Sequence, residues 1–112
     1  MTYGPHLEMT VLVGEHARVH HTPLYSEIVH RSHKNGLAGA SVFRGIEGFG
    51  HSHLVHEARI LDFGAHTPII VVIVDTEARI REFLPELQEL VGDAGLITIR
   101  PVEMLSPAVG RR

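Results

Sequence analysis

The stretch TPIIVVIVD, residues 67–75, contains six β-branched residues in a row, from Ile69 to Val74. Side chains of this kind favour extended backbone, and an apolar run this short is typical of a strand. Because successive side chains of a strand point to opposite faces of its sheet, an unbroken apolar run predicts a strand that is buried on both faces. The chain therefore needs a sheet that is covered on both sides.

The rest of the chain alternates strand and helix patterns around this run. Apolar residues alternate with other residues in HLEMTVLVG, which predicts a first strand. Thr22 is expected to cap the first helix with Pro23 at its first position, and Asp75 or Thr76 is expected to cap the second helix. The predicted elements are a strand over 6–14, a helix from 22 to Asn35-Gly36, a strand over 40–47, a strand over 67–75, a helix following it and a strand over 95–104.

The predicted order is β-α-β-β-α-β, which is typical of an α+β, ferredoxin-like fold with both helices on one face of a four-stranded antiparallel sheet. We expect one domain over residues 1–112, with a flexible loop over about 48–66 and a tail over about 106–112. The second face of the sheet would carry the apolar run and Leu12. Either an oligomer covers this face, or the segment around Gly64 or the C-terminal tail does so within one chain.

Composition excludes several classes of protein. The absence of cysteine excludes disulfides, catalysis by a thiolate and zinc sites that use cysteine ligands. A net charge of −3 with a single lysine, Lys34, offers no basic surface for nucleic acid, so no nucleic-acid partner is expected. No cationic leader precedes an apolar run, which predicts a cytoplasmic protein. Ten histidines are the compositional outlier.

Glycine punctuates the segment GLAGASVFRGIEGFG, residues 36–50, five times. A glycine within a strand costs roughly 0.5–1 kcal/mol relative to alanine, so the pattern needs a reason. Gly36 suits the end of a helix, and Gly39 precedes the next strand. Gly45, Gly48 and Gly50 surround the exit from that strand, where a hinge or the close approach of a ligand favours glycine.

This segment, the order of elements and VGDAGLITI before the last strand together resemble the PII-like superfamily of trimeric signalling proteins. Within that superfamily, the segments LVGE, PLYSEIV, VVIVD and LITIRPVEML are similar to an uncharacterised PII-related family, a domain of unknown function. The resemblance covers nearly the whole chain. It implies a homotrimer that acts as a non-enzymatic signalling or regulatory protein.

The resemblance also implies a nucleotide site. In PII proteins, the glycine-rich turn into the second strand and a Gly-Asp-Gly loop before the last strand line clefts between subunits that bind adenine nucleotides. Carried onto this sequence, the first wall of such a cleft consists of Gly36, Gly39, Ala40, Ser41 and Val42. The second wall consists of Gly92, Asp93 and Gly95. The implied effector is AMP, ADP or ATP.

The sequence departs from the PII pattern after the second wall. Leu96 stands where PII proteins carry a lysine, which removes an expected phosphate contact. Arg100 is either a substitute phosphate ligand or a solvated strand residue. The resemblance further places a loop hinge at Gly48, Phe49 and Gly50, and implies that the loop over 48–66 contacts a partner, such as a membrane transporter or channel.

Histidines support an alternative interpretation. The segment HSHLVH brings His51, His53 and His56 within six residues, and imidazole is a common ligand of zinc and copper. These residues are either a metal site, as in a CutA-like trimer, or solvated loop histidines. An enzyme is not predicted, because no serine lies in a nucleophile elbow and Glu47 and Asp62 are equally consistent with surface carboxylates.

Overall fold

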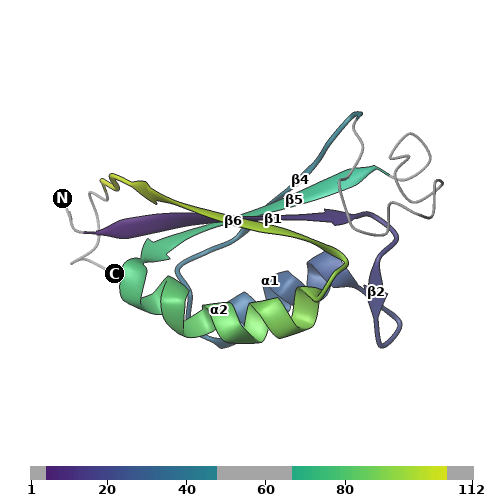
Figure 1. Cartoon of the computed structure of the whole chain (residues 1–112), viewed down its shortest axis with the longest axis horizontal. Coiled ribbons are helices and arrows are strands. Elements are labelled where there is room, and N and C mark those ends of the chain that lie inside the picture. The colour runs from purple at the N-terminus through teal and green to yellow at the C-terminus, as the bar shows by residue number, and fades with distance from the viewer. Residues whose placement is uncertain (1–4, 48–66, 106–112) are drawn as a thin grey trace.

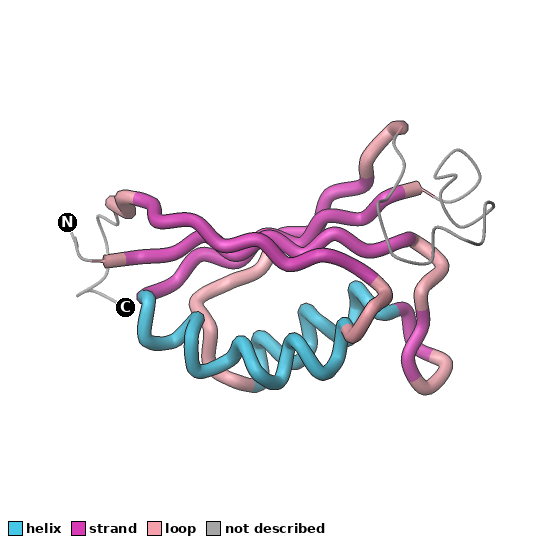
Figure 2. Tube along the Cα trace, in the orientation of Figure 1, coloured by secondary structure: helices cyan, strands magenta, loops and turns pink. Residues whose placement is uncertain are grey.

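The computed structural model describes residues 5–47 and 67–105 and contains two layers, a sheet and a pair of helices (Figures 1 and 2). Its strands are β1 (His6–Gly14), β2 (Arg18–Val19), β3 (Thr22–Pro23), β4 (Ser41–Arg44), β5 (Pro68–Thr76) and β6 (Gly95–Val102). Its helices are α1 (Leu24–Lys34) and α2 (Glu77–Val91). With 11 and 15 residues, neither helix of the described part has the roughly 20 residues needed to cross a bilayer.

The main sheet has the strand order β4-β5-β1-β6, and every neighbouring pair is antiparallel. Both helices cover the same face of this sheet (Figure 1). The predicted ferredoxin-like arrangement is therefore confirmed. The β-branched run lies in β5, an inner strand with a neighbour on each side. Its helix-facing residues are buried, but the alternate residues on the other face are only half-buried, so the predicted burial on both faces is not reached in the single chain.

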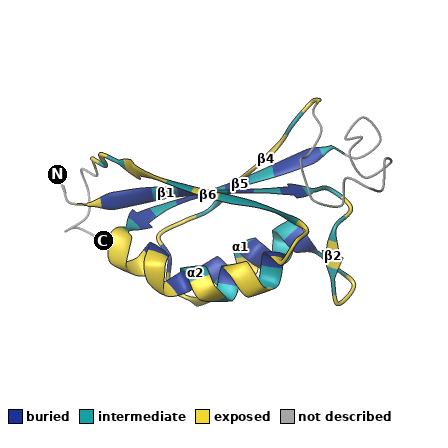
Figure 3. Ribbon diagram, viewed as in Figure 1, coloured by how far each residue is buried: buried dark blue, intermediate teal, exposed yellow. Residues whose placement is uncertain are grey.

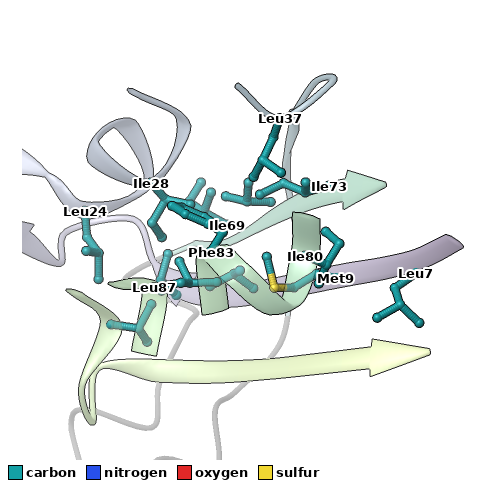
Figure 4. Close-up of a cluster of buried hydrophobic side chains, with 14 residues drawn as sticks. Leu7, Met9, Leu24, Ile28, Leu37, Ile69, Ile73, Ile80, Phe83 and Leu87 are labelled. Carbon is teal, nitrogen blue, oxygen red and sulfur yellow. The ribbon is translucent and has the colours of Figure 1, made fainter. Parts of the chain in front are cut away.

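The core lies between the sheet and the helices. Buried side chains alternate along β1 and β5 and meet the apolar faces of the helices (Figures 3 and 4). The buried hydrophobic residues are Leu7, Met9, Val11, Val13, Leu24, Ile28, Leu37, Ile69, Val71, Ile73, Ile80, Phe83, Leu87 and Val91. Burial of this surface is the main contribution to the stability of the fold.

The start of α1 differs from the prediction. Thr22 and Pro23 form β3, which pairs with β2, and α1 begins at Leu24 without a capping side chain. The turn of this additional hairpin contains His20 and His21, which have φ values of 49° and 70°. Two positive φ values in a row are typical of a hairpin turn, but asparagine and glycine are the residues that usually signal one. Two histidines gave no such signal, so the hairpin was not predicted.

The ends of the helices follow local rules. The amide of Gly36 donates to the His33 carbonyl, and the amide of Leu37 donates to the Ser32 carbonyl. With a φ of +80° at Gly36, these bonds form a Schellman motif, as the prediction of a helix end at this glycine requires. The hydroxyl of Thr76 accepts a hydrogen bond from the amide of Arg79 at 3.2 Å, so Thr76 caps α2.

The strand predicted over 40–47 is shorter than expected and covers only Ser41–Arg44. At its end, the amide of Gly45 donates to the Pro68 carbonyl at 2.7 Å. A Cβ atom at position 45 would lie only 2.6 Å from Cγ of Pro68. Close packing of β4 against the start of β5 is therefore a structural reason for this glycine.

The face of the sheet opposite the helices carries an apolar row. Phe43 is paired with Ile70, Ile70 with Leu12, and Leu12 with Leu96. Paired residues of neighbouring strands point to the same face, and this face is the one that alternates with the buried residues of β1 and β5. Phe43 is 54% exposed in the single chain. The predicted apolar second face is therefore present, and the two segments proposed to cover it lie outside the described residues.

Candidate functional site

The first wall leads from the helix layer to the edge of the sheet. Gly36 follows α1, and Ser41 and Val42 begin the edge strand β4. Figure 2 shows the connecting loop passing from the helices to the sheet. Val42 is exposed, although it lies at the start of a strand. An edge strand with an exposed apolar side chain is available for contact with a ligand or with another chain.

The second wall forms the turn between α2 and β6, the opposite edge strand. Gly92 ends α2 with a φ of 54°, and its amide donates to the Gln88 carbonyl at 2.9 Å. Asp93 is exposed in the turn, and Gly95 is the first residue of β6. The turn therefore places three of the predicted residues together at one end of the sheet.

The glycines of the two walls differ in whether the conformation or packing of the chain requires a glycine there. Gly36 and Gly92 have positive φ values at helix ends, and a Cβ atom on Gly95 would lie 2.2 Å from the Leu12 carbonyl oxygen. These three glycines therefore have structural explanations. Gly39 has neither feature, because a Cβ atom there would have no atom of the described chain within 4 Å.

Within one chain, the loop of the first wall lies far from the second wall. The amide of Ala38 beside Gly39 bonds to Asp75, which is paired with Leu7, whereas Gly95 is paired with Val13. Six residues of strand separate Leu7 from Val13, about 20 Å along the sheet. The walls also lie on opposite edges, β4 and β6. The loop end of the first wall is therefore distant from the second wall within one chain, whereas its strand residues Ser41 and Val42 lie nearer to it along the sheet.

Arg100 lies apart from the second wall. Its Nε donates to Oε1 of Glu8 at 2.6 Å on the face opposite the helices, and its guanidinium is largely exposed. The hydrogen bond and the charge of Glu8 raise the pKa of Arg100 above its usual value. Within the described chain, this side-chain contact links β6 to β1. The contact of Arg100 with phosphate stays a prediction.

Several other predicted residues lie outside the described part of the chain. They are the hinge residues Gly48, Phe49 and Gly50 and the histidines His51, His53 and His56. Among residues 5–47 and 67–105, no group of three or more histidine, cysteine, aspartate or glutamate side chains is arranged to hold a metal ion.

A carboxylate that the sequence did not single out connects three strand ends. Glu15, directly after β1, accepts hydrogen bonds from the Arg44 guanidinium and the Thr67 hydroxyl, and its amide donates to the Thr67 carbonyl at 2.9 Å. These residues follow β1, end β4 and precede β5. The hydrogen bond from Thr67, then that from Arg44, holds the pKa of Glu15 below its usual value. The only sequence signal was the position of Glu15 at the end of LVGE.

Replacing Glu15 with glutamine is expected to make the stability of the protein less dependent on acid pH. Because the folded pKa of Glu15 lies below its ordinary value of 4.5, its stabilising effect is complete above that pH and is lost as the pH falls through the folded value. The difference in unfolding free energy between wild type and Glu15→Gln should therefore shrink below pH 4.5. Urea denaturation between pH 3 and pH 7 measures it. A difference that stays constant over this range would contradict the role of Glu15. So would the same pH-dependent difference for the control Glu89→Gln, which changes an exposed glutamate on α2.

Comparisons with known proteins give a family match. The family described as "Uncharacterized ACR", DUF190, matches residues 6–104. A UPF0166 protein of Aquifex aeolicus is 34% identical over 83 residues, which are 74% of this chain and 77% of that protein.

Solved structures share the fold at low sequence identity. CPII of Thiomonas intermedia, bound to ADP, AMP and acetate, superposes with a TM-score of 0.65 at 11% identity, covering 97% of this chain and 96% of that one. A putative PII-like signalling protein of Thermus thermophilus gives a TM-score of 0.61 at 17% identity, covering 94% of both chains. From the family match and the shared architecture together, the chain belongs to the uncharacterised DUF190 family and has the PII-like fold.

Proposed function

We propose that the protein is a non-enzymatic signalling protein that forms a homotrimer and binds an adenine nucleotide between its subunits. The observation that carries this proposal is the location of the two walls on opposite edges of one sheet. In a closed ring, the β4 edge of one chain lies beside the β6 edge of the next, so each interface combines one first wall with one second wall.

The glycine pattern supports a site at such an interface. Gly39 has no conformational or packing reason within the described chain, and a side chain there would extend into open space. A bound ligand is a reason for keeping that space free, because backbone amides of a glycine-rich turn can approach phosphate closely. A PII-like protein of the same fold, CPII, binds ADP and AMP, which makes an adenine nucleotide the first effector to test.

The apolar row supports the assembly. Phe43, Ile70, Leu12 and Leu96 cross the whole sheet on the face that lacks helices. A contiguous apolar surface on a soluble chain usually marks an interaction site. Three copies related by a threefold axis cover this face in every subunit at once, which an open arrangement does not achieve.

A thermal-shift screen tests the nucleotide. AMP, ADP or ATP at 100 times its dissociation constant should add about 2.7 kcal/mol of stability to the wild-type protein, a rise of several degrees in melting temperature. Replacing Gly39 with valine should remove this rise because the side chain fills the cleft. It should leave the melting temperature without nucleotide almost unchanged, because no described atom lies within 4 Å of the new Cβ.

Ala78→Val is the matched control, since it enlarges a small exposed residue of α2 that belongs to neither wall. This variant should respond to nucleotide as the wild type does. Zinc and copper belong in the same screen. A rise with either metal and none with any nucleotide would refute the nucleotide site and favour the metal-binding alternative.

A further inference from the structure

The loop that carries the first wall is held by a charged residue in the core. Asp75 is on the helix-facing side of β5, where the alternate residues Ile69, Val71 and Ile73 are all buried and apolar. Asp75 is itself only 6% exposed. Burying a carboxylate is unfavourable unless hydrogen bonds compensate for the lost water, so its place in this row needs an explanation.

Both oxygens of this carboxylate bind backbone amides. Oδ2 accepts from the amide of Ala38 at 2.9 Å, and Oδ1 accepts from the amide of Thr76 at 2.7 Å. Ala38 lies between Gly36 and Gly39, 37 residues before Asp75 in the chain. One carboxylate therefore connects the first wall to the junction between β5 and α2.

Arg79 makes a second connection from the same junction. Its Nη1 donates to the Gly36 carbonyl at 2.6 Å, and its amide is bonded to the capping hydroxyl of Thr76. An acceptor on β5 and a donor on α2 thus bind two backbone groups that are two residues apart in the loop. Together they set both the position and the direction of the peptide groups between Gly36 and Ala38.

The sheet itself does not hold this loop. Pairing between β4 and β5 begins only at Ser41, opposite Val72. In the described chain, hydrogen bonds connect the loop over 36–40 to the β5–α2 junction through Asp75 and Arg79, while Leu37 is buried in the core and Ala40 packs against it. Removing either polar contact should therefore loosen the loop without disturbing the strand ladder.

We propose that Asp75 and Arg79 are positioning residues of the effector site, which hold the first wall in the geometry that binds the nucleotide. This inference rests on the proposed function. Asp75 acts through Ala38, and Arg79 acts through Gly36. A carboxylate is needed at position 75 because it offers one acceptor oxygen to each of two amides.

The test compares Asp75→Asn with wild type in two measurements. Asparagine is close to aspartate in size but has only one acceptor oxygen for the amides of Ala38 and Thr76. Calorimetric titration with ADP should show at least a tenfold weaker affinity. Hydrogen exchange at the Ala38 amide, followed by NMR at a temperature where every variant is folded, should become at least tenfold faster.

Two further variants separate positioning from general stability. Arg79→Met replaces an exposed side chain with an unbranched one that has no donor, and should weaken ADP binding several-fold. Because position 79 is exposed, this variant tests the proposal even if Asp75→Asn does not fold. Ile73→Val removes one methylene from the same face of β5 and should lower the melting temperature without changing ADP affinity or Ala38 exchange.

The two hypotheses fail differently. A wild-type protein that does not bind ADP, AMP or ATP contradicts the proposed function itself. A wild-type protein that binds ADP while Asp75→Asn and Arg79→Met bind it equally well contradicts only the positioning role.

Discussion

Replacing Leu12 with glutamate is expected to convert a particle of three chains into single chains, a threefold loss of mass. Leu12 is at the centre of the apolar row, with Ile70 on one side and Leu96 on the other. In the proposed trimer, the substitution brings three unpaired carboxylates into an apolar interface, which is strongly unfavourable. Light scattering coupled to size exclusion at micromolar concentration measures the effect directly.

The control is Ala78→Glu on the exposed surface of α2, which adds the same charge away from the apolar row. This variant should keep the wild-type mass. Wild-type protein that has the mass of one or two chains would contradict the trimer. A Leu12→Glu variant that keeps the full mass would show that the subunits meet through a different surface.

Replacing Gly95 with alanine is expected to lower the free energy of unfolding by about 1–3 kcal/mol or more, the usual cost of forcing extra volume into a packed site. The new Cβ atom would lie 2.2 Å from the Leu12 carbonyl oxygen and 2.8 Å from Cγ1 of Val13. Both belong to β1, the neighbouring inner strand, so the clash is relieved only by moving β6 away from the sheet.

Gly39→Ala is the matched control, because the same added methyl group meets no described atom within 4 Å. Its unfolding free energy should stay within about 0.5 kcal/mol of wild type, as for most surface substitutions. Urea denaturation of the three proteins at one fixed chain concentration gives the comparison. Equal stability of Gly95→Ala and wild type would mean that β6 does not approach β1 as closely as the structure shows.

These two glycines also show how far the candidate site could be predicted. The family resemblance assigned both to a nucleotide cleft on the basis of their position in the chain. The structure gives Gly95 a packing reason and leaves Gly39 without one. Sequence alone does not separate these cases, because the atoms that crowd a glycine come from another strand.

The order and type of the main elements were determined by the sequence itself. The apolar run from Ile69 to Val74 predicted one strand, and the alternation in residues 6–14 predicted another. These predictions succeeded because hydrophobic periodicity is a local property that each segment carries independently. The hairpin at His20 and His21 was missed because its turn lacks the residues that normally signal one.

The tertiary structure alone decided which residues meet. Glu15 bonds Thr67 across 52 residues of chain, and Asp75 bonds Ala38 across 37. No local pattern specifies such pairs, because their geometry follows from the pairing of β5 with both β1 and β4. The same pairing places the two walls on opposite edges of the sheet, since an antiparallel order of four strands separates β4 from β6 by the two inner strands. The sequence thus determined the elements, and their packing decided which edge of the sheet carries each wall.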